Sequence, residues 1–443
     1  MLMFNDMEKE ITSSCYQLPP LELLDEYTSE GNVVSTGKTA LDEKVASERK
    51  VVPDEEIAGK TESIRTALGK GKVPVKDIKA VPGPAVTLYK VYPERGVRIS
   101  KVRTLMEDMA LDLHLKGVRV VTLEDSIGIE IANNHRASVP IRSVLGDDAF
   151  RNSKAELPVA IGRTFGNKVK VFDLAKAPHL LIAGATKQGK TVAINAVVAS
   201  LLYSKRPEEL KFVFLDPKGC EFSAYSRLGG HYLATLSGEN PIVQTKDQAG
   251  KTLEALCEEM EARYSHLSVG SISNIVEYNK QASTPQERWP YIVTIIDEYA
   301  DLTISVSRDK ESRNMSHNIA SSIIHLAQKG RAVGIHVILA TQRPSKDVIT
   351  NPIKANFPTR IAVRTASKTD SRAILDTPGA ESLLGGGDMI LQTGGEAVRL
   401  QGAYINPEEI ARLTSYVESC PESGSPCCLP TSSPSEPKSH RDA

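Results

Sequence analysis

One stretch of the sequence has the residue types and the spacing needed to bind a nucleoside triphosphate. Residues 184–191 read GATKQGKT, which matches the phosphate-loop pattern GxxxxGK[ST]. In such a loop the glycines let the backbone wrap around phosphate oxygens, Lys190 contacts the β- and γ-phosphates, and the Thr191 hydroxyl reaches Mg²⁺. Residues 179–183 predict a strand before the motif and a helix follows it, which is the context the motif requires. The predicted nucleotide-binding residues are Gly184, Ala185, Thr186, Lys187, Gln188, Gly189, Lys190, Thr191 and Val192.

A second motif supplies the groups needed for hydrolysis. The apolar residues 291–296 predict a buried strand, and Asp297 and Glu298 follow it directly. Asp297 is expected to act with Thr191 in binding Mg²⁺, usually through a water, and Glu298 to orient and deprotonate the attacking water. Acidic strand ends are common, but this one follows a phosphate loop in the same predicted domain, which favours the catalytic interpretation. The two motifs together predict an ATPase that uses ATP and Mg²⁺.

A third strand also ends in a polar residue. Residues 336–341 predict a strand, and Gln342 comes directly after it. A polar side chain at that place can sense the γ-phosphate, so Gln342 is the candidate sensor. The alternative is a simple turn, because turns often begin with Gln or Arg after a strand.

The order of the predicted elements places these motifs in an α/β domain. Beyond residue 158, short apolar strands alternate with helical stretches, which is typical of a parallel sheet covered on both faces. The predicted strands are residues 179–183, 211–215, 291–296, 336–341 and 359–365, with a last helix over 407–417. Earlier in the chain the predicted elements are strands over 85–92, 118–123 and 127–132 and a helix over 99–115. The predicted domains are a polar, largely disordered tail over 1–75, a small α+β domain over 76–150, an ATPase domain over 151–420 and a disordered tail over 421–443.

Composition limits the class of protein further. A formal net charge of -1 over 443 residues shows no overall basic excess, so any contact with nucleic acid has to come from a local patch. The six cysteines form no CxxC pair and no metal-ligand set, which predicts reduced thiols in a cytosol. No apolar run approaches the ~20 residues that a membrane-spanning helix needs, and the first residues lack the features of a signal peptide. We therefore expect a cytoplasmic protein without membrane insertion.

Taken in order, these segments resemble the FtsK/SpoIIIE family of DNA translocases, which are hexameric ring motors with a RecA-like core. The likeness covers roughly residues 81–404. The segments that carry it include residues 184–191, 216–221 (DPKGCE), 297–301 (DEYAD), 326–336 (LAQKGRAVGIH), 340–344 (ATQRP), 379–385 (GAESLLG) and 387–389 (GDM). The resemblance implies an α/β, RecA-like P-loop NTPase core with a mainly parallel sheet, preceded by a small α+β domain that forms its own ring. It also implies double-stranded DNA as the partner and a homohexamer as the assembly.

The resemblance also assigns a role to Arg331. In the family's rings the ATP site lies between subunits, and the position of Arg331 in residues 328–332 (QKGRA) suggests that it reaches the γ-phosphate of a neighbour. A rigid, always-charged guanidinium suits that role. The alternative is an arginine at a helix end that offsets the helix dipole.

Three departures from the family pattern are expected to matter. Family members commonly carry N-terminal transmembrane segments and often a C-terminal winged-helix domain, and neither is visible here. We therefore expect neither septal anchoring nor sequence-directed loading by this chain. The polar, charged residues 305–318 are expected to form a longer loop than is usual in the family.

A local basic excess lies between residues 346 and 372, where six basic residues stand against two acidic ones. Facing a ring channel, such residues would bind backbone phosphates without reading the sequence of the DNA. The alternative is a solvated basic face. The candidate DNA contacts are Lys354, Arg364, Lys368 and Arg372. Related ring ATPases that act in protein secretion or in conjugative transfer of single-stranded DNA stay open as alternatives, as does a nucleotide-binding switch without motor action.

Overall fold

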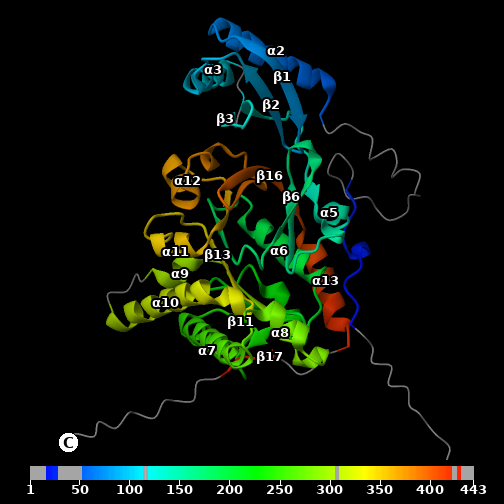
Figure 1. Cartoon of the computed structure of the whole chain (residues 1–443), viewed down its shortest axis with the longest axis vertical. Helices are drawn as coiled ribbons and strands as arrows, with labels where there is room; N and C mark the ends of the chain where they lie inside the picture. The colour runs from blue at the N-terminus through cyan, green and yellow to red at the C-terminus, as the bar shows by residue number, and fades with distance from the viewer. Residues whose placement is uncertain are drawn as a thin grey trace, which may run out of the picture.

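The computed structural model describes residues 16–27, 52–112, 115, 118–304, 309–421 and 427–430. In this part of the chain a small α+β domain stands at one end of a larger α/β domain (Figure 1). Most of the predicted tails, residues 1–15, 28–51, 422–426 and 431–443, lie outside the described residues.

The centre of the larger domain is an eleven-stranded sheet. Six neighbouring strands run parallel in the order β11-β9-β12-β13-β8-β14, and β15, β16, β6 and β7 extend the sheet in antiparallel fashion, with β5 paired to β16. The parallel strands are β8 (His179–Ala183), β9 (Leu210–Leu215), β11 (Ile242–Val243), β12 (Tyr291–Ile296), β13 (Ile335–Thr341) and β14 (Thr359–Val363). The others are β5 (Val139–Pro140), β6 (Pro158–Arg163), β7 (Val169–Asp173), β15 (Asp388–Thr393) and β16 (Glu396–Tyr404).

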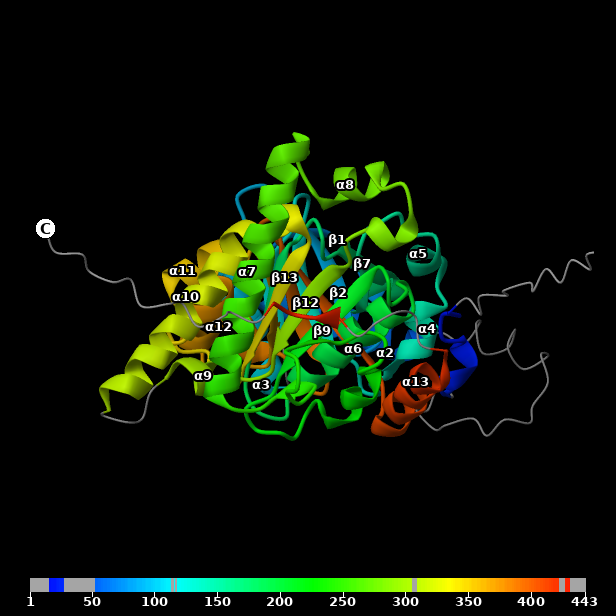
Figure 2. The same ribbon diagram turned by 90° about the horizontal axis from the view of Figure 1, so that it is seen from below.

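Helices cover both faces of this sheet, so the central strands are buried on both sides. Leu180 and Leu181 are neighbours on β8 and belong to two separate cores, because successive side chains of a strand point to opposite faces. Figure 2 shows α6 and α13 on one side and α7 and α10 on the other. The helices of this domain are α4 (Ile141–Leu145), α5 (Asp148–Arg151), α6 (Lys190–Leu202), α7 (Lys246–Gly270), α8 (Ile275–Gln281), α9 (Tyr299–Thr303), α10 (Lys310–Val333), α11 (Asn351–Asn356), α12 (Lys368–Leu375) and α13 (Pro407–Ser419).

The small domain has its own core beneath an antiparallel sheet of order β1-β2-β4-β3. Its core includes Ile64, Tyr89, Met106 and Ile129, contributed by two helices and two strands. Its elements are α2 (Asp54–Lys70), β1 (Val75–Pro82), β2 (Val86–Pro93), α3 (Ile99–Asp112), β3 (Arg119–Thr122) and β4 (Ile127–Ala132).

The structure differs from the sequence-based expectations in four segments. Residues 54–70, expected in a tail, form α2, because Ile64 and Leu68 are buried against the small domain. The expected loop over 305–318 is helical from Lys310 onward, with Asp309 as its N-cap; residues 305–308 lie outside the described part. Residues 16–27 contact α13, where Asp25 pairs with Arg412 at 2.6 Å. In the expected C-terminal tail, β17 (Cys427–Cys428) pairs with β10 (Ala234–Thr235).

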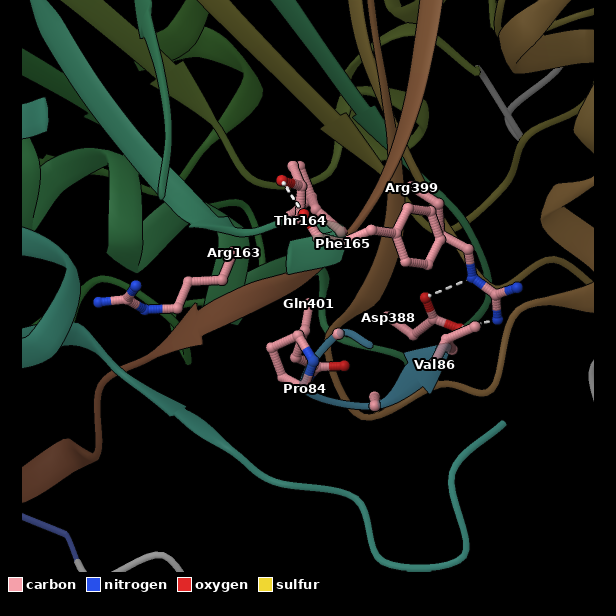
Figure 3. A pocket seen from close by; sticks show the side chains of 11 residues that line it. Pro84, Val86, Arg163, Thr164, Phe165, Asp388, Arg399 and Gln401 are labelled. Atoms are coloured by element: carbon pink, nitrogen blue, oxygen red, sulfur yellow. Dashed lines mark hydrogen bonds and ion pairs between the residues drawn. The ribbon is translucent and has the colours of Figure 1, made fainter. Parts of the chain in front are cut away.

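A buried cluster of charged side chains joins the two domains. Arg399 of β16 donates to both carboxylate oxygens of Asp388, at 3.0 and 2.6 Å, and to Glu130 of the small domain at 2.8 Å. Arg119 lies 3.3 Å from the same Glu130. Figure 3 shows Arg399 and Asp388 in the lining of a small pocket between the domains, to which Pro84 and Val86 of the small domain also contribute. The small domain is therefore attached to β15 and β16 through ion pairs as well as through the chain itself.

Candidate nucleotide site

The phosphate loop lies where the sequence predicts it, between the carboxyl end of β8 and the start of α6. Gly184 has a φ of +155°, and a Cβ there would come within 2.7 Å of the Val363 carbonyl oxygen, so only glycine fits. Residues 184–189 form the turn, and Lys190, Thr191 and Val192 begin α6. The N–H groups at the start of this helix face the same edge of the sheet, which favours an anion there.

Lys190 at the start of α6 and Asp297 after β12 form a buried ion pair. The Lys190 ammonium donates to Asp297 Oδ1 at 2.5 Å and to the Asp297 carbonyl at 2.6 Å. Burial raises the pKa of Asp297, and the ammonium of Lys190 opposes that rise. The other carboxylate oxygen, Asp297 Oδ2, is buried and has no hydrogen-bond partner among the described residues. A free carboxylate oxygen at the phosphate loop fits a hydrated Mg²⁺ that also binds phosphates.

Glu298 follows Asp297 and is held by donors from the neighbouring strand. Its side chain is only 1% exposed, and its two oxygens accept from the Thr341 hydroxyl at 2.6 Å and from the Gln342 backbone N–H at 2.9 Å. The Lys218 ammonium lies 3.6 Å from the same carboxylate. The sequence predicted Glu298 as the base, but it gave no sign of Thr341 or Lys218 as its partners.

Gln342, the candidate sensor, contacts the phosphate loop directly. Its side-chain oxygen accepts a hydrogen bond from the Thr186 hydroxyl at 2.7 Å, while its backbone N–H binds Glu298. The residue therefore links the loop that would hold the phosphates to the carboxylate that would act on water. This placement is compatible with a sensor, and the role itself stays a prediction.

Arg331 lies at the opposite edge of the sheet. It occupies the last turn of α10, before β13 starts at Ile335, whereas the nucleotide site lies after β13 ends at Thr341. Six residue steps along a strand span about 20 Å, so Arg331 cannot reach the phosphates of its own subunit. The side chain is exposed and forms no ion pair within the described part of the chain. A contact with ATP therefore requires a second copy of the chain.

The four candidate DNA contacts occupy three different environments. Lys354 pairs with Asp376 at 2.7 Å, a carboxylate that Arg360 also contacts at 2.6 Å, so its ammonium is held within an ion-pair cluster. Arg364 follows β14 beside the phosphate loop, where its carbonyl accepts from the Ala185 N–H at 2.8 Å. Lys368 and Arg372 lie four residues apart on α12, exposed, and without ion pairs in the described structure. The structure therefore distinguishes the paired Lys354 from the three exposed candidates, of which Lys368 and Arg372 share α12.

Membrane-spanning helices and clusters of metal-binding side chains are both absent from the described residues. No helix in the described ranges is long and apolar enough to cross a membrane. The same ranges contain no group of three or more His, Cys, Asp or Glu side chains that could hold a metal by themselves. The cytoplasmic location stays a prediction.

Comparison with protein families gives two matches that together cover most of the chain. A model described as the FtsK/SpoIIIE family matches residues 140–346, and one described as the FtsK alpha domain matches residues 37–133. The second match includes α2, which the sequence-based division had placed in the tail.

Curated relatives extend this similarity over more of the chain. A protein called DNA translocase FtsK from Chlorobaculum tepidum is 42% identical over 368 residues, which are 81% of this chain and 44% of the relative. The Haemophilus influenzae protein of the same name is 40% identical over 398 residues, which are 83% of this chain and 72% of the relative. The chain thus spans less than half of the first relative and nearly three quarters of the second.

Solved structures agree with the fold. The conjugation coupling protein TcpA of pCW3, in its monomer form with ATPγS, has a TM-score of 0.57 at 24% identity, covering 80% of this chain and 98% of that one. The cytoplasmic domain of the type VII secretion ATPase EccC from Thermomonospora curvata has a TM-score of 0.54 at 24% identity, covering 65% and 35%. These structures confirm the predicted α/β fold of a P-loop ATPase with a mostly parallel sheet core.

Proposed function

This chain belongs to the FtsK/SpoIIIE family, and we propose that it hydrolyses ATP to move double-stranded DNA without regard to its sequence. The observation that carries the ATPase half is the meeting of the phosphate loop, Asp297 and Glu298 at one edge of the sheet. The DNA half is supported by the names of the relatives and by the exposed cations of α12. ATP hydrolysis and movement of DNA are tested by different measurements.

In the proposed reaction each residue of the site has a separate task. Lys190 would leave Asp297 and bind the β- and γ-phosphates, and Thr191 and the freed Asp297 carboxylate would hold Mg²⁺. The metal neutralises phosphate charge when bound. Glu298 orients the attacking water and takes its proton. Gln342, which contacts both the phosphate loop and Glu298, couples the conformation of that loop to Glu298.

We propose that the working assembly is a homohexameric ring. The support is the position of Arg331, which is exposed, without an ion pair among the described residues, and separated from its own site by the length of β13. In a ring the same arginine would lie at the neighbour's γ-phosphate and stabilise the charge that develops there. We further propose that the small domain, together with α2, forms a second ring on the motor ring.

Contact with DNA is assigned to Lys368 and Arg372. Both lie on the exposed side of α12, one helical turn apart, so both ammonium and guanidinium groups can reach one phosphate backbone. Each phosphate contact contributes about 0.9 to the slope of log affinity against log salt. Replacing both residues by alanine should therefore lower that slope by about 1.8.

The experiment that tests the function measures ATP hydrolysis with duplex DNA, with single-stranded DNA and without a polymer. Duplex DNA of any sequence should stimulate the rate most, and the Lys368→Ala, Arg372→Ala double variant should lose the stimulation while keeping basal hydrolysis. Lys354→Ala serves as the matched control, because its ammonium is held by Asp376 and its side chain is only 18% exposed. Preferential stimulation by single-stranded DNA would favour a conjugative role, and equal rates in all three conditions would favour a secretion motor or a switch.

A further inference from the structure

Lys218 is a charged residue beside the candidate catalytic base, Glu298. It belongs neither to the phosphate loop nor to the Asp297–Glu298 pair. Its ammonium lies 3.6 Å from Glu298 Oε2 and 3.8 Å from Asp301 Oδ2. The lysine side chain is 41% exposed, whereas the Glu298 side chain is 1% exposed. An ammonium group thus covers the solvent side of an almost fully buried carboxylate.

The loop that carries Lys218 is shaped by one buried side chain. Asp216 follows β9 and its carboxylate accepts from the backbone N–H groups of Gly219 at 2.9 Å, Glu221 at 2.9 Å and Phe222 at 3.1 Å. Gly219 takes a φ of +68°, which turns the chain back at this point. Because β9 and β12 are parallel neighbours, with Leu215 opposite Ile296, the tip of this loop stands over the end of β12. The position of Lys218 next to Glu298 is therefore built into the fold.

The charges around Glu298 show why this position matters. The other contacts of its carboxylate, the Thr341 hydroxyl and the Gln342 N–H, are neutral donors. Lys190 of the phosphate loop is engaged by Asp297. A buried carboxylate without a counter-charge is costly, so Lys218 supplies the positive charge that Glu298 needs.

We propose that Lys218 is a positioning residue for ATP hydrolysis, whose ammonium provides the counter-charge of the Glu298 carboxylate and fixes its orientation toward the attacking water. The inference rests on the proposed function, since Glu298 acts on water only if the chain hydrolyses ATP. Lys218 acts through Glu298 and not on the nucleotide, so it should affect turnover and leave ATP affinity unchanged.

The test is a double-mutant cycle on basal, DNA-free hydrolysis by the full chain, with ATP affinity measured in parallel. Lys218→Ala should lower kcat by about tenfold or more at an unchanged Kd for ATP, because a displaced base costs turnover rather than binding. Lys218→Arg should recover most of the loss, because it restores the positive charge. In a Glu298→Gln background, Lys218→Ala should change the residual single-turnover rate by less than about twofold, because no charge remains to be paired.

Two further variants separate the explanations. Asp301→Asn removes the other partner of Lys218 and should retain most of the turnover, and Lys251→Ala, on a surface pair with Asp247, controls for loss of a lysine. The inference is overturned if Lys218→Ala turns over normally, if it weakens ATP binding, if Asp301→Asn reproduces its loss, or if the two losses multiply in the Glu298→Gln background. A wild-type chain without any turnover would be a different result, since it would overturn the proposed function itself and the inference with it.

Discussion

Replacement of Arg399 by methionine should destabilise the protein far more than loss of an ordinary arginine. The Arg399 side chain is 1% exposed and pairs with two carboxylates, Asp388 and Glu130, which are 2% and 4% exposed. Pairing with these two carboxylates outweighs the opposing effect of burial and raises the pKa of Arg399 above its usual value, so the guanidinium is charged at every working pH. Methionine fills a similar volume but leaves the carboxylates without their main partner.

The size of the stability loss depends on which partners Asp388 and Glu130 retain after Arg399 is replaced. Glu130 keeps Arg119 at 3.3 Å, whereas among the described residues the Asp388 carboxylate keeps only the backbone N–H of Leu384, at 2.8 Å. Removing one partner of a buried ion pair costs about 3–5 kcal/mol. The same change at Arg412, which is 42% exposed and pairs with Asp25, should cost about 0–1 kcal/mol.

The assay is the free energy of unfolding from chemical denaturation of Arg399→Met and Arg412→Met, measured side by side. A triple variant with Arg399→Met, Asp388→Asn and Glu130→Gln should recover part of the loss, because no unpaired buried charge remains. The reasoning is refuted if Arg399→Met loses no more stability than Arg412→Met. It is also refuted if neutralising the two carboxylates makes Arg399→Met less stable still.

Three further predictions concern the site and its pH dependence. Lys190→Ala should abolish ATP binding, whereas Glu298→Gln should bind ATP normally and lose turnover by orders of magnitude. Equilibrium binding and single-turnover assays would measure the two effects. Normal turnover in Glu298→Gln would show that Glu298 is not the catalytic base. Arg331→Ala should bind ATP but hydrolyse it poorly, and mixing it with Glu298→Gln should restore some activity if sites are shared; subunits that mix yet stay inactive would count against sharing. Burial lowers the pKa of His336 to about 4, below the ordinary value near 6.5. Between those values the unfolded chain binds the extra proton, so the free energy of unfolding should fall as pH falls from about 6.5 to 4. The amide of Asn in His336→Asn can replace the Nδ1 contact with the Pro178 carbonyl. This variant should show a smaller change in the free energy of unfolding between pH 7 and pH 5, measured by denaturation curves. An unchanged pH dependence would contradict the prediction.

The central sheet and the nucleotide motifs were predictable because their signals are local. β8 and β12 are buried on both faces, so they read as short continuous apolar runs in the sequence. The motif residues follow those strands, and the carboxyl ends of parallel strands meet at one edge of the sheet. The meeting of Lys190 with Asp297 then follows from the order of the strands.

The antiparallel half of the sheet had no comparable signal. β16 begins with exposed residues and carries the buried Arg399 at its centre, which breaks both the apolar run and the regular alternation. The partners of Arg399 are far away in sequence, and Glu130 lies in the other domain. Helix α2 was missed because its few apolar residues become a core only against α3 and the small sheet.

The ion-pair partners of individual charged residues could not be predicted from the sequence either. Lys354 and Lys368 look alike in the sequence, but Asp376 pairs with Lys354, 22 residues away, and not with the nearer Lys368. Lys218 reaches Glu298 because a buried aspartate folds its loop, and no spacing rule links residues so far apart. Contacts of this kind depend on the tertiary structure and not on local pattern.

The most direct test of the central claim is displacement of a triplex-forming oligonucleotide from duplex DNA by the full chain. We predict ATP-dependent displacement with a lag that grows with the length of duplex to be crossed, whatever its sequence, and no displacement with Glu298→Gln. A chain that hydrolyses ATP on DNA but never displaces the oligonucleotide, or displaces it with no dependence on distance, would contradict the proposal that it moves along duplex DNA.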